Sequence, residues 1–229
     1  MVHLLAQTYP RLYHVATADA WPGIIRHGLL STAALLDLFE VDGASRYRIE
    51  RQRRPESITI SHQTHGTATI RDQKPLLEGR LATALADMTV EEYYVFLNQH
   101  VFFWPTKRRM LTMLGARAYK GRPQLVLTVD SEALLGHHGS QVLLSHINSG
   151  ATSPFAWPRG RGTFQNLEGY PLGERIRSYG KANGVAEVLV GQAIIPITNV
   201  ALAAEIWASA QSVATVWSQP AKTRSRRET

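Results

Sequence analysis

The sequence predicts an α+β fold whose strands pair in an antiparallel or mixed arrangement. Helical patterns dominate the first half of the 229 residues, and short apolar, β-favouring runs dominate the second half. Helices and strands do not alternate in the regular order that is typical of a parallel sheet. Because 44% of the residues are hydrophobic and 19% are charged, we expect a chain that buries a substantial core.

The first elements follow from short apolar runs and capping residues. Residues 12–15 form an apolar, β-favouring run and predict a strand. Residues 21–28 predict a helix, with proline in its first turn and glycine at its end. Ser31 is suited to cap a second helix over residues 32–39. The arginine-rich residues 40–55 are expected to be part helix and part loop.

The remaining elements are predicted by the same rules. Alternating or continuous apolar runs predict strands at residues 57–61, 68–71, 101–104, 125–129, 141–144, 185–190 and 193–197. Helical spacing and N-capping threonines predict helices at residues 75–86, 90–98, 106–119 and 199–207. Residues 149–173 are rich in Gly, Pro and Ser and predict a long loop. We expect one domain over residues 1–217 and a basic, disordered tail over 218–229.

The positive charge of the chain is clustered. The formal net charge is +7, and three segments hold most of the excess. They are the stretch with Arg46, Arg48, Arg51, Arg53 and Arg54, the acid-free stretch with Lys107, Arg108, Arg109, Arg117, Lys120 and Arg122, and the tail with Lys222, Arg224, Arg226 and Arg227. Such clusters attract polyanions, so we expect a nucleic-acid or nucleotide partner, the alternative being a basic surface without a partner.

Several function classes are disfavoured. The chain has no cysteine, which excludes disulfides, thiolate metal sites and a cysteine nucleophile. The nine histidines lack metal-ligand spacing, so we expect no metal. No apolar run approaches the ~20 residues of a membrane span, and the N-terminus does not have the pattern of a signal peptide. We therefore expect a cytoplasmic protein that does not associate with a membrane.

Glu187 is the most unusual polar residue of the sequence. It lies within the apolar run 185–190, and its neighbours on the same strand face, Val185 and Leu189, are hydrophobic. Burying a carboxylate there costs free energy unless the group is paired or lines a cleft. The alternatives are a functional carboxylate and an edge-strand glutamate that faces water.

Three ordered segments resemble the ADP-ribosyltransferase fold and, within it, the DarT-type enzymes that modify nucleic-acid bases. These segments are Leu-Tyr-His-Val at 12–15 with His-Gly-Leu-Leu at 27–30, Val-Phe-Phe-Trp-Pro at 101–105 with Met-Leu at 110–111, and Ala-Glu-Val-Leu-Val at 186–190 with Ile-Pro at 195–196 and Val200. The resemblance implies split mixed or antiparallel sheets, with flanking helices around an NAD cleft. It also implies that NAD is a substrate and that nicotinamide is released.

The resemblance further implies roles for individual residues. Glu187 would be the catalytic carboxylate and Arg71 the catalytic arginine, with Arg46, Arg48 and Arg51 as alternatives for the arginine. The expected NAD contacts are His14 at the adenosine-side ribose, Tyr13, Phe103 or Tyr119 against nicotinamide, and Asn148 and Ser149 in a supporting loop. Nucleic acid would meet Arg46, Arg48, Arg51, Lys107, Arg108 and Arg109.

Three functional hypotheses remain from the sequence. The first is NAD-dependent ADP-ribosylation of a DNA or RNA base by a toxin or phage-defence effector, with the presence of an antitoxin partner left open. The second is a non-catalytic basic module that binds nucleic acid or a nucleotide. The third is a transferase of the same fold that acts on protein or on an RNA 2′-phosphate.

Overall fold

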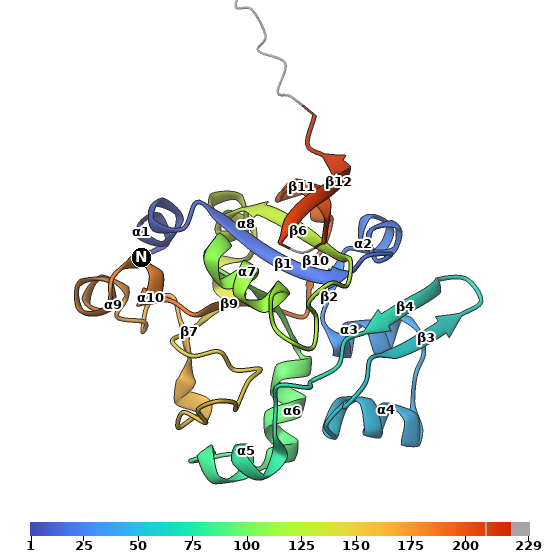
Figure 1. Cartoon of the computed structure of the whole chain (residues 1–229), viewed down its shortest axis with the longest axis horizontal. Coiled ribbons are helices and arrows are strands. Elements are labelled where there is room, and N and C mark those ends of the chain that lie inside the picture. The colour runs from blue at the N-terminus through green and yellow to red at the C-terminus, as the bar shows by residue number, and fades with distance from the viewer. Residues whose placement is uncertain (209, 221–229) are drawn as a thin grey trace, which may run out of the picture.

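The computed structural model describes residues 1–208 and 210–220, and Figure 1 shows how the elements are arranged. The helices are α1 (Val2–Thr8), α2 (Trp21–His27), α3 (Thr32–Leu38), α4 (Gly43–Arg51), α5 (Glu78–Ala84), α6 (Val90–Asn98), α7 (Lys107–Leu114), α8 (Ser131–His138), α9 (Leu172–Tyr179) and α10 (Lys181–Gly184). The strands are β1 (Arg11–Thr17), β2 (Leu29–Leu30), β3 (Ile58–His62), β4 (Gly66–Ile70), β5 (His100–Phe103), β6 (Gln124–Asp130), β7 (Val142–Ser145), β8 (Phe164–Asn166), β9 (Glu187–Gly191), β10 (Ala193–Ile194), β11 (Ala201–Ala208) and β12 (Gln211–Ser218). Short 3₁₀ helices are η1 (Gly139–Gln141), η2 (Arg161–Thr163) and η3 (Ile197–Asn199).

Two four-stranded antiparallel sheets form the centre of the fold. The first sheet has the strand order β1-β6-β11-β12, and the second has the order β5-β9-β7-β8. An antiparallel bridge between Tyr13 and Trp104 joins the edge strand β1 of the first sheet to the end of β5 in the second. The predicted α+β class with split antiparallel sheets is therefore confirmed.

The main hydrophobic core contains residues of both sheets. From β6 of the first sheet, Leu125, Leu127 and Val129 enter this core, and Val188 and Val190 of β9 enter it from the second sheet. The intervening Val126 belongs to a separate cluster on the opposite face of β6. Because β6 is covered on both faces, its sequence is a continuous apolar run rather than an alternating one.

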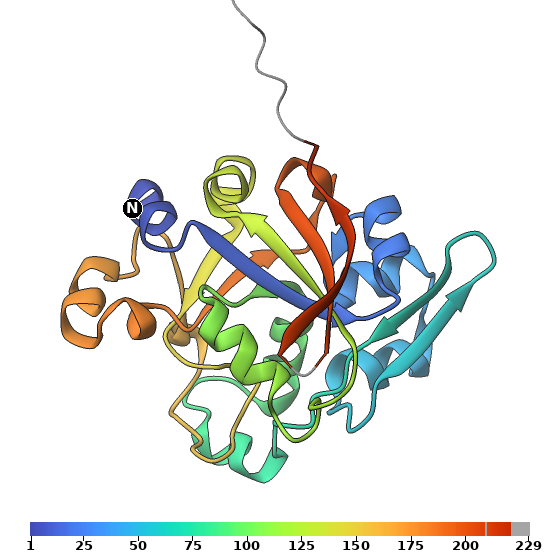
Figure 2. The ribbon, with the colours of Figure 1, turned by 45° about the horizontal axis from the view of Figure 1, so that its top comes forward.

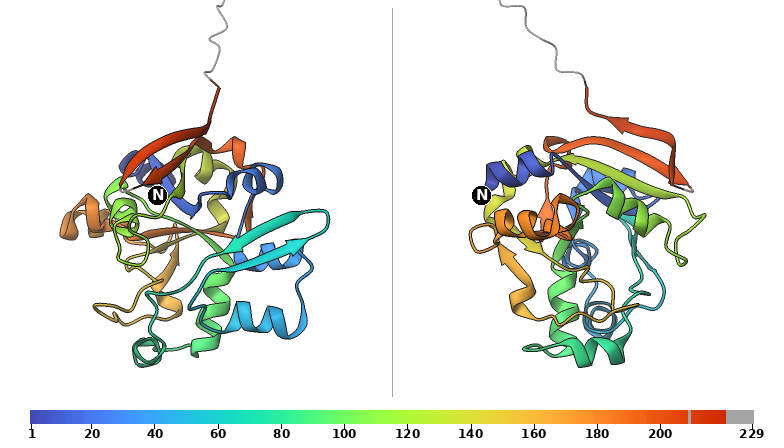
Figure 3. Two further views of the ribbon diagram at one scale, coloured as in Figure 1. Left: turned by 45° about the vertical axis from the view of Figure 1, so that its right-hand side comes forward. Right: turned by 60° about the vertical axis from the view of Figure 1, so that its left-hand side comes forward.

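The hairpin of β3 and β4 projects from the body beside α3 and α4 (Figures 2 and 3). A small hydrophobic cluster holds it there and includes Leu36, Phe39, Ile49, Ile60 and Ile70. These side chains come from α3 and its end, from α4, and from the two hairpin strands. The hairpin thus packs against α3 and α4, with β4 leading directly into the segment around Arg71.

Helix α6 begins at the predicted N-cap Thr89, which forms a capping box with Glu92. The Thr89 hydroxyl accepts a hydrogen bond from the Glu92 backbone N–H at 3.2 Å, and Glu92 Oε2 accepts one from the Thr89 backbone N–H at 2.8 Å. Helix α6 carries the buried Tyr93 and Asn98, both of which lie near the candidate site described below. The cap therefore fixes the start of a helix on which that site depends.

We predict that Thr89→Ala lowers the free energy of unfolding by about 1 kcal/mol, because it leaves an N-terminal backbone N–H of α6 without its acceptor. Thr83 provides a matched control, since its hydroxyl is exposed and donates only to the Arg80 carbonyl within α5. Urea unfolding of both variants measures the difference. Equal destabilisation by Thr89→Ala and Thr83→Ala would contradict the assigned cap.

The clearest error of sequence prediction lies at residues 199–207, which were expected to be helical. The structure places them in η3 and the strand β11. The sequence Ala-Leu-Ala-Ala-Glu favours a helix, but β11 pairs with β6 on one side and β12 on the other. Register shifts along β11 leave Ala201, Ala204 and Trp207 buried, a spacing of three that resembles a helical pattern.

Other boundaries also differ from expectation. Helices α1, α8 and α9 and the strand β12 were not predicted, and α7 ends at Leu114 rather than near residue 119. Strand β12 extends through Ser218, the first residue assigned to the tail, and residues 221–229 lie outside the described residues. Within residues 1–208 and 210–220, no helix is both long enough and apolar enough to cross a membrane.

Candidate active-site cleft

A cleft of about 410 Å³ lies against β1. Its lining comes from β1, α2, the start of α3, β4 and the segment after it, and residues 148–150. Its volume falls within the range of about 300–1,000 Å³ that is typical of small-molecule sites. Of the predicted site residues, the cleft brings together Glu187, Arg71, His14, Tyr119, Asn148 and Ser149.

Glu187 is the first residue of β9 and lines this cleft while being only 3% exposed. Its Oε2 accepts a hydrogen bond from the Ser149 backbone N–H at 3.0 Å. Burial raises the pKa of Glu187 from 4.5 to about 7, against the opposing effects of Ser149, Arg109 and Arg159. The group is therefore a buried carboxylate poised to change its charge near neutral pH.

His14 of β1 lines the same cleft in a fixed orientation. Its Nδ1 lies 2.8 Å from the Phe102 carbonyl oxygen, which can only accept a hydrogen bond, so Nδ1 carries the proton. Burial lowers the pKa of His14 to about 4, and the ring is neutral at pH 7. Its Nε2 is then an acceptor with no protein partner among the described residues, so a ligand hydroxyl could donate to it.

Arg71 follows β4 and lies between β1 and Tyr119. One of its guanidinium nitrogens donates to the Val15 carbonyl at 3.1 Å, and the guanidinium lies 4.7 Å from the centre of the Tyr119 ring. The Tyr119 hydroxyl donates to Asp72 Oδ1 at 2.9 Å, and burial raises the pKa of Tyr119 to about 12. These contacts hold a cation and an aromatic ring together at the wall of the cleft.

Two expected NAD contacts do not line the cleft. Phe103 is 1% exposed and belongs to the core between the sheets, where its ring meets the edge of His14 at a centroid distance of 5.8 Å. Tyr13 packs with the cluster on the other face of β1, because successive side chains of a strand point to opposite faces. Of the three aromatic residues expected to contact nicotinamide, Tyr119 alone lines the cleft. Asn148 is exposed at the cleft beside the buried Ser149.

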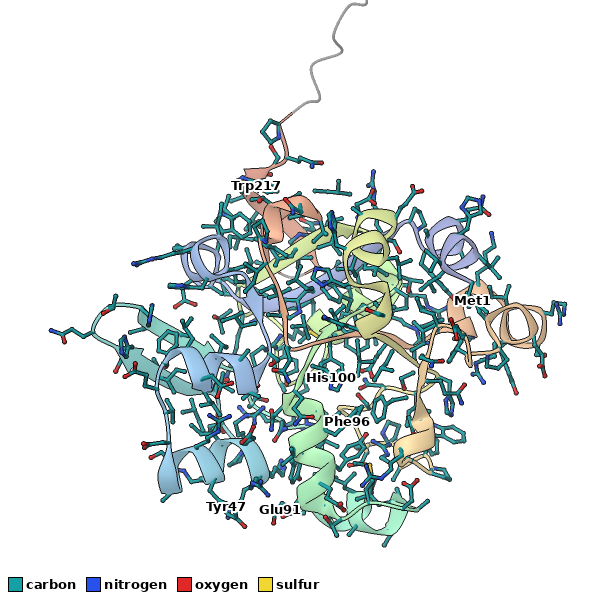
Figure 4. All side chains as sticks on the ribbon, turned by 180° about the vertical axis from the view of Figure 1, so that it is seen from behind. Met1, Tyr47, Glu91, Phe96, His100 and Trp217 are labelled. Atoms are coloured by element: carbon teal, nitrogen blue, oxygen red, sulfur yellow. The ribbon has the colours of Figure 1, made fainter. Side chains whose placement is uncertain are left out.

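The arginines of α4 do not line the cleft, and much of their charge is paired. Arg46 forms ion pairs with Asp37 and Glu50, and Arg51 pairs with Glu91 of α6. Figure 4 shows Tyr47 of α4 close to Glu91 at this junction. These arginines therefore dock α4 onto its neighbours. Arg48 is exposed and has no ion pair within the described residues. Of the four candidates for the catalytic arginine, Arg71 alone lines the cleft.

The basic residues at the start of α7 have three different environments. Lys107 lies 5.1 Å from the centre of the Trp207 ring, and Arg108 is exposed. Arg109 donates to the Ala182 carbonyl at 3.3 Å and to Asn183 Oδ1 at 3.4 Å. Its positive charge also favours the ionised form of Glu187. The Arg109 guanidinium is thus partly occupied by hydrogen bonds within the protein, whereas Lys107 and Arg108 are exposed at the surface.

Sequence reasoning missed the buried polar residues that support the cleft. Arg54 is 6% exposed, lines the cleft and donates to the backbone carbonyls of Arg71 and Ile49. Burial lowers its pKa to about 10. Arg159, which is 2% exposed, and Tyr93 both donate to the Ser149 carbonyl. Arg54 was recognised only as part of a basic cluster, and Arg159 lies in the segment predicted to be a loop.

Part of the cleft lining is a cluster of aromatic rings. His27 of α2 and His65 of the β3–β4 turn both line the cleft, and their ring centroids are 5.0 Å apart. His65 stacks on His62 at 4.6 Å, and Phe39 is next to both rings. Among the described residues, no three His, Asp or Glu side chains group closely enough to hold a metal ion.

The chain belongs to the family of unknown function DUF7002, whose family model matches residues 10–201. No curated protein matches its sequence. Among solved structures, the chain is similar to Thermosipho africanus DarTG in complex with ADP-ribose, at 13% sequence identity and a TM-score of 0.41. That match covers 86% of this chain and 43% of the other, so this chain spans less than half of that protein.

Proposed function

We propose that this protein is an ADP-ribosyltransferase that cleaves NAD and transfers ADP-ribose to a nucleic-acid base. The observation that carries the proposal is that Glu187 and His14 line one cleft. They are separated by more than 170 positions in the sequence and belong to different sheets. Both were selected from the sequence because their segments resemble DarT-type enzymes. Had they faced different surfaces, the proposal would have no site.

The reaction breaks the bond between the nicotinamide nitrogen and C1′ of its ribose. The bonding electron pair leaves with nicotinamide, and the ribose acquires positive charge in an oxocarbenium-like transition state. An ionised Glu187 would stabilise that charge and accept a hydrogen bond from a ribose hydroxyl. A nucleophilic atom of the acceptor then bonds to C1′ and loses its proton, which Glu187 is able to accept.

The other cleft residues suit the remainder of an NAD molecule. The neutral His14 offers Nε2 to a hydroxyl of the adenosine-side ribose. Arg71 supplies positive charge for the diphosphate or the acceptor, and Tyr119, whose ring packs against Arg71, is the remaining aromatic candidate for contact with nicotinamide. Asn148, exposed at the cleft, would contribute its amide to the sugar or the leaving group.

A nucleic-acid acceptor is supported by basic side chains that remain at the surface. Arg48, Lys107 and Arg108 are exposed, and the chain carries a net charge of +7. Such charges favour phosphate contacts. Arg46, Arg51 and Arg109 have protein partners and take a smaller part in this proposal. Action as a cytoplasmic toxin or phage-defence effector, with an antitoxin partner, extends the same proposal.

The acceptor is identified by incubating the protein and NAD with DNA and RNA oligonucleotides of varied sequence. Nicotinamide release is measured, and intact masses show which molecule gains ADP-ribose. A mass gain on an oligonucleotide supports the proposal, whereas a gain on protein or on an RNA 2′-phosphate identifies the alternative transferases. Salt-sensitive binding of oligonucleotides without nicotinamide release would instead identify a non-catalytic binding module.

We predict that kcat/KM for nicotinamide release rises with pH, is half-maximal near pH 7 and reaches a plateau at higher pH. The raised pKa of Glu187, about 7, leaves the carboxyl protonated and inactive at lower pH. Below that pKa, the rate should fall by about tenfold for each pH unit, because kcat/KM follows the ionisation of the free enzyme. Initial rates between pH 5 and 9 measure the profile, and a constant rate from pH 5 to 8 would contradict it.

A further inference from the structure

Ser149 is held on both sides by buried residues. Its backbone N–H donates to Glu187 Oε2, while its carbonyl accepts from Arg159 Nη1 and from the Tyr93 hydroxyl, each at 3.0 Å. Tyr93, Arg159 and Glu187 are at most 3% exposed. Ser149 therefore bridges the candidate catalytic carboxylate and a buried guanidinium.

Arg159 contacts carbonyls of the loop that contains Ser149. Its Nε donates to the Trp157 carbonyl and its Nη2 to the Ala151 carbonyl, both at 3.0 Å. The side chain thereby fixes three points of one loop with a single planar group. A buried charge without strong hydrogen bonds is costly, and carbonyl dipoles together with the nearby carboxylate offset that cost.

The backbone of Arg159 is anchored independently of this loop. Its N–H donates to the Ala84 carbonyl at 2.8 Å, and its carbonyl accepts from the Ala86 N–H at 3.0 Å. These bonds join Arg159 to the end of α5. Arg159 therefore links the end of α5 to the loop, and its contact with Ser149 links the loop to Glu187.

We infer that Arg159 is a positioning residue for Glu187, acting through the Ser149 backbone. By fixing the Ser149 carbonyl it orients the N–H that Glu187 accepts, and its buried positive charge favours the ionised carboxylate. The inference rests on the proposed function for its effect on catalysis, although its structural part is independent of any reaction. The other charged or titratable groups beside Glu187 are Arg109 from α7 and Tyr93 from α6.

Arg109 makes it possible to test the effect of a nearby positive charge on Glu187 separately from the effect of Ser149 position. Its charge favours ionised Glu187, yet its hydrogen bonds go to residues 182 and 183 rather than to Ser149. Arg159→Lys keeps a positive charge but loses the planar set of donors. Arg109→Gln removes a charge and leaves the contacts of Ser149 in place. The exposed Arg161, two positions after Arg159, provides a surface control as Arg161→Gln.

The experiment measures the Ser149 amide proton shift by NMR and nicotinamide release from NAD in these three variants. We expect Arg159→Lys to move the Ser149 amide upfield and to lower the rate by about tenfold or more. Arg109→Gln should raise the pH at which the rate is half-maximal by up to about one unit without moving that amide. Arg161→Gln should match the wild type in both measurements.

The outcomes separate this inference from the proposed function. A folded Arg159→Lys with an unchanged Ser149 amide, or with a rate within twofold of wild type, overturns the positioning role. If wild-type protein releases no nicotinamide, the proposed function fails, and the amide shift still decides whether Arg159 orients Ser149. If Arg159→Lys does not fold, Arg159→Gln takes its place, and a folded Arg159→Gln with an unmoved Ser149 amide overturns the inference.

Discussion

Glu187→Gln is expected to reduce nicotinamide release by about 10²- to 10⁴-fold, because it removes the negative charge and the base from the reacting ribose. Glutamine has nearly the same shape and keeps an oxygen that can accept the Ser149 N–H. The loss would therefore report on charge rather than on packing. Chromatographic quantification of nicotinamide measures it, with the exposed Glu168 as the matched control in Glu168→Gln. A rate within threefold of wild type would exclude Glu187 as the catalytic carboxylate.

The same variant is expected to be more stable than wild type at pH 8. The pKa of Glu187 is raised from 4.5 to about 7 in the folded protein, so the folded state binds the proton more tightly than the unfolded state. The contribution of this group to stability is fully present below pH 4.5 and declines as pH rises to 7. Above that pH, Glu187→Gln removes the cost and should raise the free energy of unfolding by about 1–3 kcal/mol. The free energy of unfolding in urea at pH 8 measures this difference. If Glu187→Gln is less stable than wild type there, ionised Glu187 does not carry the cost of burial that its raised pKa implies.

Arg71→Ala is expected to weaken NAD binding by about 10- to 100-fold, since it removes charge-assisted hydrogen bonds at the cleft wall. Arg71 is held by the Val15 carbonyl and the Tyr119 ring, so its position is fixed before a ligand arrives. Calorimetric titration in the Glu187→Gln background measures affinity without turnover.

Arg48→Ala is the matched control for Arg71→Ala, because Arg48 is exposed on α4 and does not line the cleft. It should leave NAD affinity unchanged. An equal loss in both variants would indicate a general effect of net charge, and no loss in Arg71→Ala would remove Arg71 from the site.

The sequence predicted the parts of the site that lie on strands with clear patterns. Glu187 stood out because a carboxylate interrupts an apolar run, and the structure places it at the start of β9 beside the cleft. His14 was selected because the segment around it resembles the opening strand of DarT-type enzymes. The interruption of an apolar run by Glu187 is a local pattern, which a single sequence displays directly.

The supporting residues could not be predicted because their role depends on distant backbone groups. Arg159 lies in a segment rich in Gly, Pro and Ser that predicts a loop, and its importance comes from three carbonyls that the fold brings around it. For a related reason, the sequence did not show that Tyr13 and Phe103 lie outside the cleft lining. Aromatic character was visible in the sequence, but the face that each residue presents was set by the packing of β1 and β5.

Strand β11 shows how tertiary pairing overrides local preference. Its first five residues, Ala-Leu-Ala-Ala-Glu, favour a helix, and its buried positions repeat every three residues because of register shifts in the sheet. Only pairing with β6 and β12 makes this segment a strand. Neither neighbour can be inferred from the segment itself, so a pattern-based prediction was bound to favour a helix there.

The most direct test is a crystal structure of the Glu187→Gln variant with NAD, in which turnover is prevented. NAD is predicted to occupy the cleft along β1, with the nicotinamide-side ribose within hydrogen-bonding distance of residue 187. The adenosine-side ribose should donate a hydroxyl to His14 Nε2. NAD bound at another surface, or a cleft that takes no NAD at millimolar concentration, would contradict the proposed ADP-ribosyltransferase site.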